Sequence, residues 1–436
     1  MTRQNIIGSL VLTVLISLNI SGCKSRSNNG TAPVNTGVAQ NERSDLNELP
    51  DLKEEAVPEK VIFFIENSGS MFGYVNQANE FKNSLVGLAY LPEFDRTEKS
   101  FYFINGTSNP VKNSRINISY IGDDPDLFKN KLDQKSFNTG DVRFSDLNKM
   151  FEIALDSAEG NRISVLVSDC IYDVGAEKDP LTALKIEIQK TQQSFRNKLG
   201  NNNIQTLIIK AYSRFDGLYH YASKGGSERI QNEERPFYII FFGKTRLLNK
   251  VLTEQSVASK IEGPFETARF FLNDEKEIFY QIVPSIGLKG DFKPDFKDKH
   301  KLINARPLKN EFQFAIATDF RSLPFSDRYL TSTANYECPY SNFNVVKVEK
   351  ITKSIPGVEG THLITVFTDK NPVGNLEIVL KNLTPAWVME TDTDNEDNID
   401  SSHTFGFRQL IDAIGEAYEY KNSGKNPATF KIQISK

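Results

Sequence analysis

Two short polar stretches follow strongly apolar segments and carry the side chains best suited to chemistry. Glu66-Asn67-Ser68-Gly69-Ser70 comes directly after the apolar run at 60–65, and Ser168-Asp169 comes directly after the run at 163–167. Carboxylate and hydroxyl oxygens dominate both stretches, with few nitrogen or sulfur donors beside them. Such oxygen ligands suit a hard divalent cation: Mg²⁺ or Mn²⁺, or else Ca²⁺. The two stretches therefore predict a cation site, provided that the fold brings them together.

The segment from about 58 to 256 alternates strand-like and helix-like patterns. Continuous apolar runs predict buried strands, and apolar residues at helical spacing predict helices between them. The expected strands are 60–65, 101–104, 118–121, 163–167, 204–211 and 236–242, and the expected helices are 75–89, 147–155, 180–200 and 247–252. This alternation predicts an α/β domain with a doubly wound, Rossmann-like sheet. Ligands of such sheets bind outside the carboxyl ends of strands, where both polar stretches fall.

At these residues the chain resembles the von Willebrand factor A (vWA) domain and its metal-ion-dependent adhesion site. The family pattern is Asp-x-Ser-x-Ser after the first strand, a Thr on a loop before a middle helix, and an Asp after the fourth strand. Ser68 and Ser70 match the two serines, and Asp169 matches the later acid. Ser145, two residues before Leu147, matches the loop hydroxyl. The resemblance implies a divalent-cation site with one coordination position open for an acidic side chain of a partner protein.

Two positions depart from the family pattern. Glu66 stands where the family has Asp, and its extra methylene adds about 1.5 Å. Magnesium requires near-ideal octahedral geometry with bonds of about 2.0–2.1 Å. Either the Glu66 carboxylate replaces a bridging water, or the site has lost tight Mg²⁺ binding. Ser145 lacks the methyl group that stiffens Thr, and Thr139 on the same loop is an alternative ligand.

Each of these residues also has an ordinary structural interpretation. Ser68 and Ser70 could satisfy backbone groups in a turn that contains glycine, and Ser145 could cap its helix. Asp169 could cap a turn or pair with a lysine. Only the ordered set, at the ends of two strands, favours metal ligation by Glu66, Ser68, Ser70, Ser145 and Asp169. Cys170 is expected to be a buried thiol.

The first 23 residues resemble a bacterial lipoprotein signal peptide. The apolar run from 6 to 18 is too short to span a bilayer core of about 30 Å, so it reads as the core of a secretion signal. Ile20-Ser21-Gly22-Cys23 resembles the lipoprotein processing box, which implies acylation of Cys23. Several acyl chains, at about 0.8 kcal/mol per buried CH₂, anchor a protein stably in a membrane. Lipoproteins retained in the inner membrane of enteric bacteria usually carry Asp after the cysteine, so Lys24 favours the outer membrane. The resemblance does not say on which face of that membrane the protein lies.

Residues 24–57 contain no aromatic residue and predict a flexible tether. A flexible coil of this length has a root-mean-square reach of about 30 Å. We therefore expect the folded part of the protein to stand away from the lipid surface.

The chain from about 257 to 436 has a different pattern. Short runs with a period of two, separated by Pro, Gly and Asn, predict a mainly β, sandwich-like domain with one helix. The expected strands are 279–283, 312–317, 345–348, 363–367, 376–380 and 430–434, and the expected helix is 407–420. The acidic stretch from Asp392 to Asp400 is expected to be a solvated loop, because it lacks the glycine and closing glutamate of an EF-hand.

Composition excludes several classes of function. The chain has 436 residues, 39% of them hydrophobic, so it can bury substantial cores. Its net charge of −4 provides no basic field for nucleic acid. Three cysteines cannot form a disulfide framework. Four histidines, His220, His300, His362 and His403, lie far apart in sequence without metal-binding spacing.

We expect a protein that is not an enzyme, because the sequence contains none of the common nucleophile, phosphate-binding or zinc-protease motifs. The predicted function is attachment to an envelope or surface protein, or scaffolding, through the cation site. Two alternatives stay open. One is a metal-independent structural module whose site is degenerate. The other is an envelope hydrolase that uses paired acids in the β-rich domain.

Overall fold

The computed structural model describes residues 57–111, 114–172, 174, 179–200, 203–273, 277–397 and 401–436. All of them belong to the unit Glu55–Lys436. The predicted signal peptide, the predicted acylation site Cys23 and nearly all of the predicted tether lie outside the described residues. Within the described ranges, no helix combines the length and the apolar composition needed to cross a bilayer.

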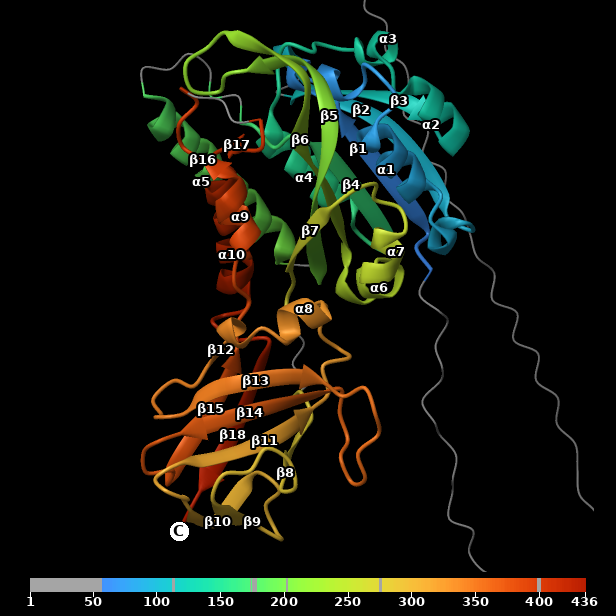
Figure 1. Cartoon of the computed structure of the whole chain (residues 1–436). Helices are drawn as coiled ribbons and strands as arrows, with labels where there is room; N and C mark the ends of the chain where they lie inside the picture. The colour runs from blue at the N-terminus through green and yellow to red at the C-terminus, as the bar shows by residue number, and fades with distance from the viewer. Residues whose placement is uncertain are drawn as a thin grey trace, which may run out of the picture. The chain divides into compact units, whose positions relative to one another are not determined.

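Seven strands form one mixed sheet in the order β3-β2-β1-β4-β6-β5-β7 (Figure 1). They are β1 (Lys60–Glu66), β2 (Glu98–Val111), β3 (Ser114–Gly122), β4 (Arg162–Ser168), β5 (Ile204–His220), β6 (Ser227–Lys244) and β7 (Phe265–Phe270). All six strands expected in this region are present. β1 pairs in parallel with both β2 and β4. The side chains of β1 and β4 are buried almost throughout, as expected for strands covered on both faces.

The order of β1, β2 and β4 creates a switch point in the sheet. From β1 the chain moves outward through β2 and β3, and it then returns to place β4 on the other side of β1. The carboxyl ends of the parallel strands β1 and β4 therefore lie side by side, and loops diverge from them in opposite directions. Such a switch point is where doubly wound sheets bind their ligands.

The remaining strand pairs are antiparallel, so the doubly wound character is limited to β2, β1 and β4. β5 and β6 form a long hairpin that turns at Gly225 and Gly226, both with positive φ. Its outer half, at about 212–235, extends beyond the ends of β4 and pairs only with itself. The sequence predicted only the inner part of each strand, because the outer half of β5 alternates buried and exposed residues and that of β6 is mostly exposed, so neither has a continuous apolar run.

Helices cover this sheet. They are α1 (Glu80–Ala89), α2 (Pro125–Lys131), α3 (Gln134–Phe137), α4 (Leu147–Ser157), α5 (Pro180–Leu199), α6 (Thr245–Val251) and α7 (Glu254–Ala258), with the 3-10 turns η1 (Gly69–Tyr74) and η2 (Pro92–Phe94). The helix expected at 75–89 starts only at Glu80, because the Asn79 side chain accepts the Lys82 N–H and caps it there.

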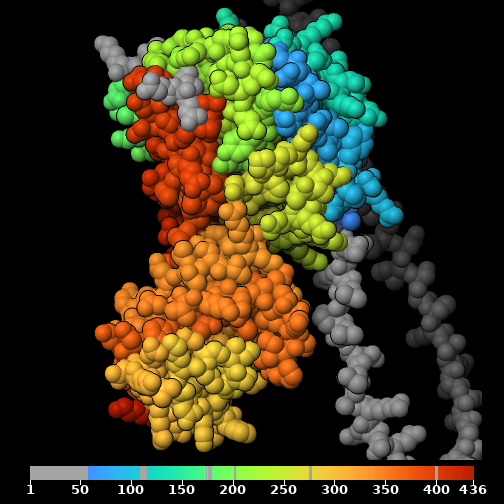
Figure 2. Space-filling model, viewed as in Figure 1, coloured from blue at the N-terminus to red at the C-terminus, as the bar shows by residue number. Residues whose placement is uncertain are grey.

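The core of the sheet extends past residue 256, where the sequence analysis placed the start of the second domain. β7 pairs with β5. The expected helix 407–420 is present as α10 (Phe407–Lys421), but it packs against α5. The Phe407 ring stacks on Tyr238 at 4.2 Å, and the Tyr418 hydroxyl donates to the Ile204 carbonyl at 3.1 Å. Figure 1 shows α10 beside α5, and Figure 2 shows atoms of this red segment among the green ones.

Three short elements accompany α10, namely α9 (Ala386–Thr391), β16 (Asp392–Thr393) and β17 (Thr404–Phe405). The Trp387 indole donates to the Thr267 carbonyl of β7 at 3.2 Å. Lys210 on β5 is buried beneath α9, and its ammonium donates to the Thr391 hydroxyl at 2.9 Å. α9 and α10 therefore cover the β7 side of the sheet.

The rest of the C-terminal region is a two-sheet sandwich, as predicted. One sheet has the order β12-β15-β18-β10-β9 and the other β13-β14-β11-β8. Their strands are β8 (Tyr280–Val283), β9 (Asp291–Pro294), β10 (Lys301–Arg306), β11 (Phe312–Thr318), β12 (Tyr336–Glu337), β13 (Asn344–Lys350), β14 (His362–Thr368), β15 (Gly374–Leu380) and β18 (Ala428–Ile434), with α8 (Asp327–Leu330) and η3 (Thr333–Asn335) between them. Side chains from both sheets share one apolar core. The pairing is antiparallel except between β10 and β18.

Candidate functional site

The Glu66 carboxylate, at the end of β1, is the centre of a buried polar cluster. Its Oε1 accepts hydrogen bonds from the Ser68 hydroxyl at 2.7 Å and the Ser145 hydroxyl at 2.8 Å. Its Oε2 accepts one from the Ser168 hydroxyl. The Ser68 and Ser70 oxygens are 3.2 Å apart. Glu66 is only 1% exposed, so these hydroxyls supply the hydrogen bonds that water supplies at a surface.

Asp169 brings a second buried carboxylate to this cluster from the end of β4. It is 1% exposed, and its Oδ1 accepts the Ile171 backbone N–H at 3.3 Å. Its Oδ2 is buried and has no hydrogen-bond partner among the described residues. A buried carboxylate oxygen without a partner is costly, and it marks a position where a cation or a water molecule would be stabilised. We call Glu66, Ser68, Ser70, Ser145, Ser168 and Asp169 the serine–carboxylate cluster.

The two carboxylates oppose one another electrostatically. Burial and the charge of Asp169 raise the pKa of Glu66 to about 7, although the three serine hydroxyls act in the opposite direction. Burial also raises the pKa of Asp169, which Arg235 and Ser70 partly offset. The cluster therefore holds more negative charge than its immediate surroundings balance, and it favours the approach of a cation.

Ser145, and not Thr139, supplies the loop hydroxyl. The Thr139 hydroxyl donates to the Ser136 carbonyl at 2.8 Å, so it serves its own loop. The Thr139 carbonyl accepts hydrogen bonds from the side-chain amides of Asn67 and Asn105 at 2.8 and 2.7 Å. These amides hold the loop against the end of β1, which brings Ser145 within reach of Glu66. The structure thus brings together all five side chains that the sequence proposed as ligands.

Ser168 is a member that the sequence analysis noticed but gave no role. Its hydroxyl donates to Glu66 and accepts the Cys170 N–H at 2.8 Å. Cys170 is fully buried, as expected, and has a φ of 57°, an unusual backbone conformation for a residue with a side chain. The turn after β4 is therefore held in a strained form that directs Asp169 toward β1, and such strain is frequent at functional sites.

His220 and Arg235 also lie beside the cluster, and the sequence analysis missed both. A Cβ atom added to Gly69 would lie 3.0 Å from the His220 Nε2 atom, so the imidazole covers the Ser68–Ser70 turn. Arg235 is 1% exposed and interacts electrostatically with Asp169. Both residues lie on the outer half of the β5–β6 hairpin. Since the sequence pattern gave no sign of that extension, it could not place them here.

The oxygen atoms of the cluster are suitable ligands for a hard cation, but its two carboxylates would not be enough without the serine hydroxyls. Among the residues that the structure describes, no group of three or more His, Cys, Asp and Glu side chains is placed to hold a metal ion. The cluster offers two carboxylates and several hydroxyls. A serine that donates its proton to Glu66 still has lone pairs free for a cation, and the partnerless Oδ2 of Asp169 is a further acceptor. These donors suit Mg²⁺ or Mn²⁺.

A polar cleft adjoins the cluster at Ser145 and gives it an approach from solvent. The cleft has a volume of about 960 Å³ and lies between α4, α5 and the ends of β2 and β3. Lys149 and Lys190 line it together with Glu152 and Glu187. Ser145 is the member of the cluster that lines this cleft.

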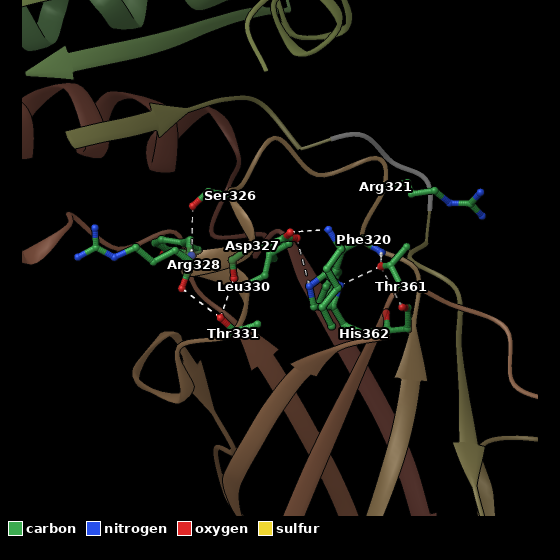
Figure 3. Close-up of polar contacts among 12 residues, drawn as sticks. Phe320, Arg321, Ser326, Asp327, Arg328, Leu330, Thr331, Thr361 and His362 are labelled. Carbon is green, nitrogen blue, oxygen red and sulfur yellow. Dashed lines mark hydrogen bonds and ion pairs between the residues drawn. The ribbon is translucent and has the colours of Figure 1, made fainter. Parts of the chain in front are cut away.

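A second polar group lies in the sandwich, where α8 meets β14 (Figure 3). His362 is 2% exposed, with its Nδ1 atom 2.9 Å from the Thr361 hydroxyl and its Nε2 atom 3.6 Å from Asp327 Oδ1. A hydroxyl, an imidazole and a carboxylate in this order occur in hydrolases. Here the Thr361 hydroxyl also accepts the Phe320 N–H at 3.0 Å, so it holds the turn after β11. We interpret the group as structural.

Burial of His362 predicts a dependence of stability on pH. Burial lowers the pKa of His362, although Asp327 acts in the opposite direction. The unfolded chain therefore takes up a proton near pH 6.5 that the folded protein resists, and stability falls as the pH drops below that value. We expect the free energy of unfolding, measured with urea, to fall less between pH 7.5 and pH 5.0 in the His362→Gln variant than in the wild type. His300→Gln, at an exposed position, should lose as much unfolding free energy between these pH values as the wild type does. Equal losses in all three proteins would contradict the interpretation.

Comparison of the chain with protein-family models, curated proteins and solved structures finds no match. The resemblance to vWA domains therefore stays a prediction from the sequence.

Proposed function

We propose that this chain is a lipid-anchored protein of the cell envelope that attaches to a partner protein through a divalent cation. The cation would be held by a vWA-like domain at the carboxyl ends of β1 and β4. The observation that carries this proposal is the serine–carboxylate cluster itself. Oxygen side chains from three separate parts of the chain converge there, two buried carboxylates repel each other, and one carboxylate oxygen has no partner among the described residues.

The role of Glu66 follows from its length. Because it reaches the Ser68 and Ser145 hydroxyls directly, it fixes the direction of both protons. The serine lone pairs are then free to face a common point, while Asp169 offers its Oδ2 atom. Outer-sphere groups of this kind commonly orient metal ligands. Glu66 therefore acts first as the residue that orients the serines, and it supplies the charge that attracts the cation.

Partner recognition would use the remaining coordination position. With Glu66 and Ser168 bonded to one another, Ser68, Ser70, Ser145 and Asp169 would supply four ligands, so water or an acidic side chain of another protein must complete the octahedral shell. The cleft beside Ser145 gives access to that position. The lipid anchor at Cys23 and the tether that follows would hold this face of the domain within reach of other envelope proteins.

A cation titration tests the proposal. We expect Mg²⁺ or Mn²⁺ to raise the melting temperature of the wild type, because a ligand at 100 times its Kd stabilises the folded state by about 2.7 kcal/mol. Ser68→Ala and Ser145→Ala should lose most of this stabilisation. Thr139→Ala is the matched control, since it removes a hydroxyl from the same loop that does not join the cluster.

The partner is tested separately by an affinity pull-down from envelopes, with and without a chelator. A protein that is retained only in the presence of the cation, and only by chains with an intact Ser68, would support attachment through the site. If neither the melting temperature of the wild type nor the set of proteins it retains changes with Mg²⁺, Mn²⁺ or Ca²⁺, the chain is instead a metal-independent structural module.

A further inference from the structure

Arg235 is a fully buried cation that no ordinary ion pair explains. It is 1% exposed, and among the described residues neither its Nε nor its Nη1 atom has a hydrogen-bond acceptor. The faces of two aromatic rings lie beside it, with the guanidinium carbon 4.6 Å from the centre of Tyr219 and 5.3 Å from that of Phe215. Aromatic faces stabilise a desolvated guanidinium, but they do not replace its lost hydrogen bonds. Burial opposes the charge of Arg235, whereas Tyr74 and the Asp169 carboxylate raise its pKa and favour the charge at this position.

The register of the sheet places that charge behind the serine–carboxylate cluster. β4 and β6 are antiparallel, and Ser168 pairs with Tyr238. Arg235 lies three residues before Tyr238 and is therefore just beyond the carboxyl end of β4, where Asp169 also lies. The positive charge of Arg235 acts on Asp169. The η1 turn starts next to Ser68 and packs on the same β5–β6 hairpin through Tyr74. The centres of the Tyr74 and Phe215 rings are 4.9 Å apart.

We infer that Arg235 is a positioning residue that makes cation binding and carboxylate binding at the cluster depend on each other. The inference rests on the proposed function. The charges decide it: with both carboxylates ionised, Glu66 and Asp169 carry −2, and Arg235 brings the buried set to −1. A divalent cation then gives +1, and one carboxylate from a partner gives zero. Without Arg235 the cation alone would neutralise the set, and a partner carboxylate would add a surplus negative charge.

This arrangement predicts modest affinity for the cation alone and stronger affinity when an anion arrives with it. Each ligand must improve the binding of the other by the same factor, because the coupling free energy belongs to both. Arg235 would thus favour an acidic partner over a neutral one, and it would keep the site from being filled permanently by free cation.

The experiment measures Mn²⁺ binding by the purified protein at pH 8, by titration with detection of free Mn²⁺, with and without acetate as a model carboxylate. In the wild type, acetate should tighten Mn²⁺ binding several-fold. Arg235→Met should bind Mn²⁺ alone about tenfold more tightly, because it removes a buried positive charge that repels the cation, and it should lose the effect of acetate.

A merely structural role for Arg235 would give the opposite sign, because a damaged site binds cations more weakly. Arg269→Met is the matched control: Arg269 lies on β7 and donates to the Leu252 carbonyl at 2.6 Å, so its loss should leave Mn²⁺ binding unchanged. Wild-type protein that binds Mn²⁺ without any response to acetate would overturn the inference, whether or not Arg235→Met folds. Wild-type protein that binds no cation under any condition would instead overturn the proposed function, on which the inference depends.

Discussion

A fragment of the chain that ends at residue 256 is expected not to fold. It would contain the whole region that the sequence analysis assigned to the α/β domain, but it would lack β7, α9 and α10. The side chains that these elements contribute to the core of the sheet are almost fully buried; they include Phe270, Trp387, Phe407, Leu410, Ile414 and Tyr418. Truncation of one large buried side chain costs about 2–5 kcal/mol, whereas a domain has about 5–15 kcal/mol in total. The loss of all of them exceeds what the fragment can withstand.

Circular dichroism and thermal melting of residues 57–256 and 57–436 would check this expectation. The longer chain should unfold in a sharp transition, and the fragment should show none. Within the full chain, Phe407→Ala should cost about 3–5 kcal/mol, while Tyr420→Ala on the exposed face of α10 should cost less than about 1 kcal/mol. A fragment that unfolds cooperatively would mean that α10 is an accessory to the sheet and not part of its core.

The parts of this fold that the sequence predicted well have strong local patterns. β1 and β4 are continuous apolar runs, and α4 has a clear apolar stripe behind an Asp146 cap. The strands of the sandwich were found because alternation and turn residues mark them. The residues of the cluster were found for a different reason. Those at 66–70 and 168–169 follow directly after strands whose carboxyl ends must lie together if β1 and β4 are parallel, whereas Ser145 was found only as a match to the family pattern.

The parts that the sequence did not predict depend on contacts between distant segments. α10 was found as a helix, but a helical stripe does not say which core it covers. Its stripe packs on α5, more than two hundred residues earlier in the chain. The outer half of the β5–β6 hairpin has weak alternation, so His220 and Arg235 were not expected beside Asp169. No local pattern links Arg235 to Asp169, because only the antiparallel register of β6 brings them together.

Glu66→Gln and Glu66→Ala are expected to change the stability of the cation-free protein in opposite directions. Glutamine has nearly the same shape and keeps one oxygen as acceptor for Ser68 and Ser145, while its N–H₂ faces the Ser168 hydroxyl, which has lone pairs to accept. It removes one of two buried charges that repel each other. At pH 8, above the pKa of about 7 that burial and Asp169 give Glu66, the folded state has to hold that charge against both effects. We therefore expect Glu66→Gln to raise the free energy of unfolding by about 1–3 kcal/mol.

Glu66→Ala removes the charge and the acceptor together. It leaves the Ser68, Ser145 and Ser168 hydroxyls without their acceptor in a buried site. Each buried polar group that loses its partner costs about 1–3 kcal/mol, and the cavity adds to this cost, so we expect a net loss of about 3–5 kcal/mol. Urea unfolding of both variants at pH 8, in the presence of a chelator, measures the two signs directly.

The buried Glu396 provides the control for this pair of variants. It accepts hydrogen bonds from the Tyr219 hydroxyl and from the backbone N–H of Ser223, and it has donors rather than a second carboxylate around it. Glu396→Gln should therefore destabilise the protein, because it turns an amide N–H₂ toward donors. If Glu66→Gln is also destabilising, the charge of Glu66 is already balanced in the cation-free protein, and the cluster has no need of a cation. We expect Glu66→Gln to be more stable than the wild type without cation and to lack the Mg²⁺-dependent rise in melting temperature. The wild type would then become the more stable protein when Mg²⁺ is added. Such a reversal is expected of a site whose buried charges lower stability until a cation binds.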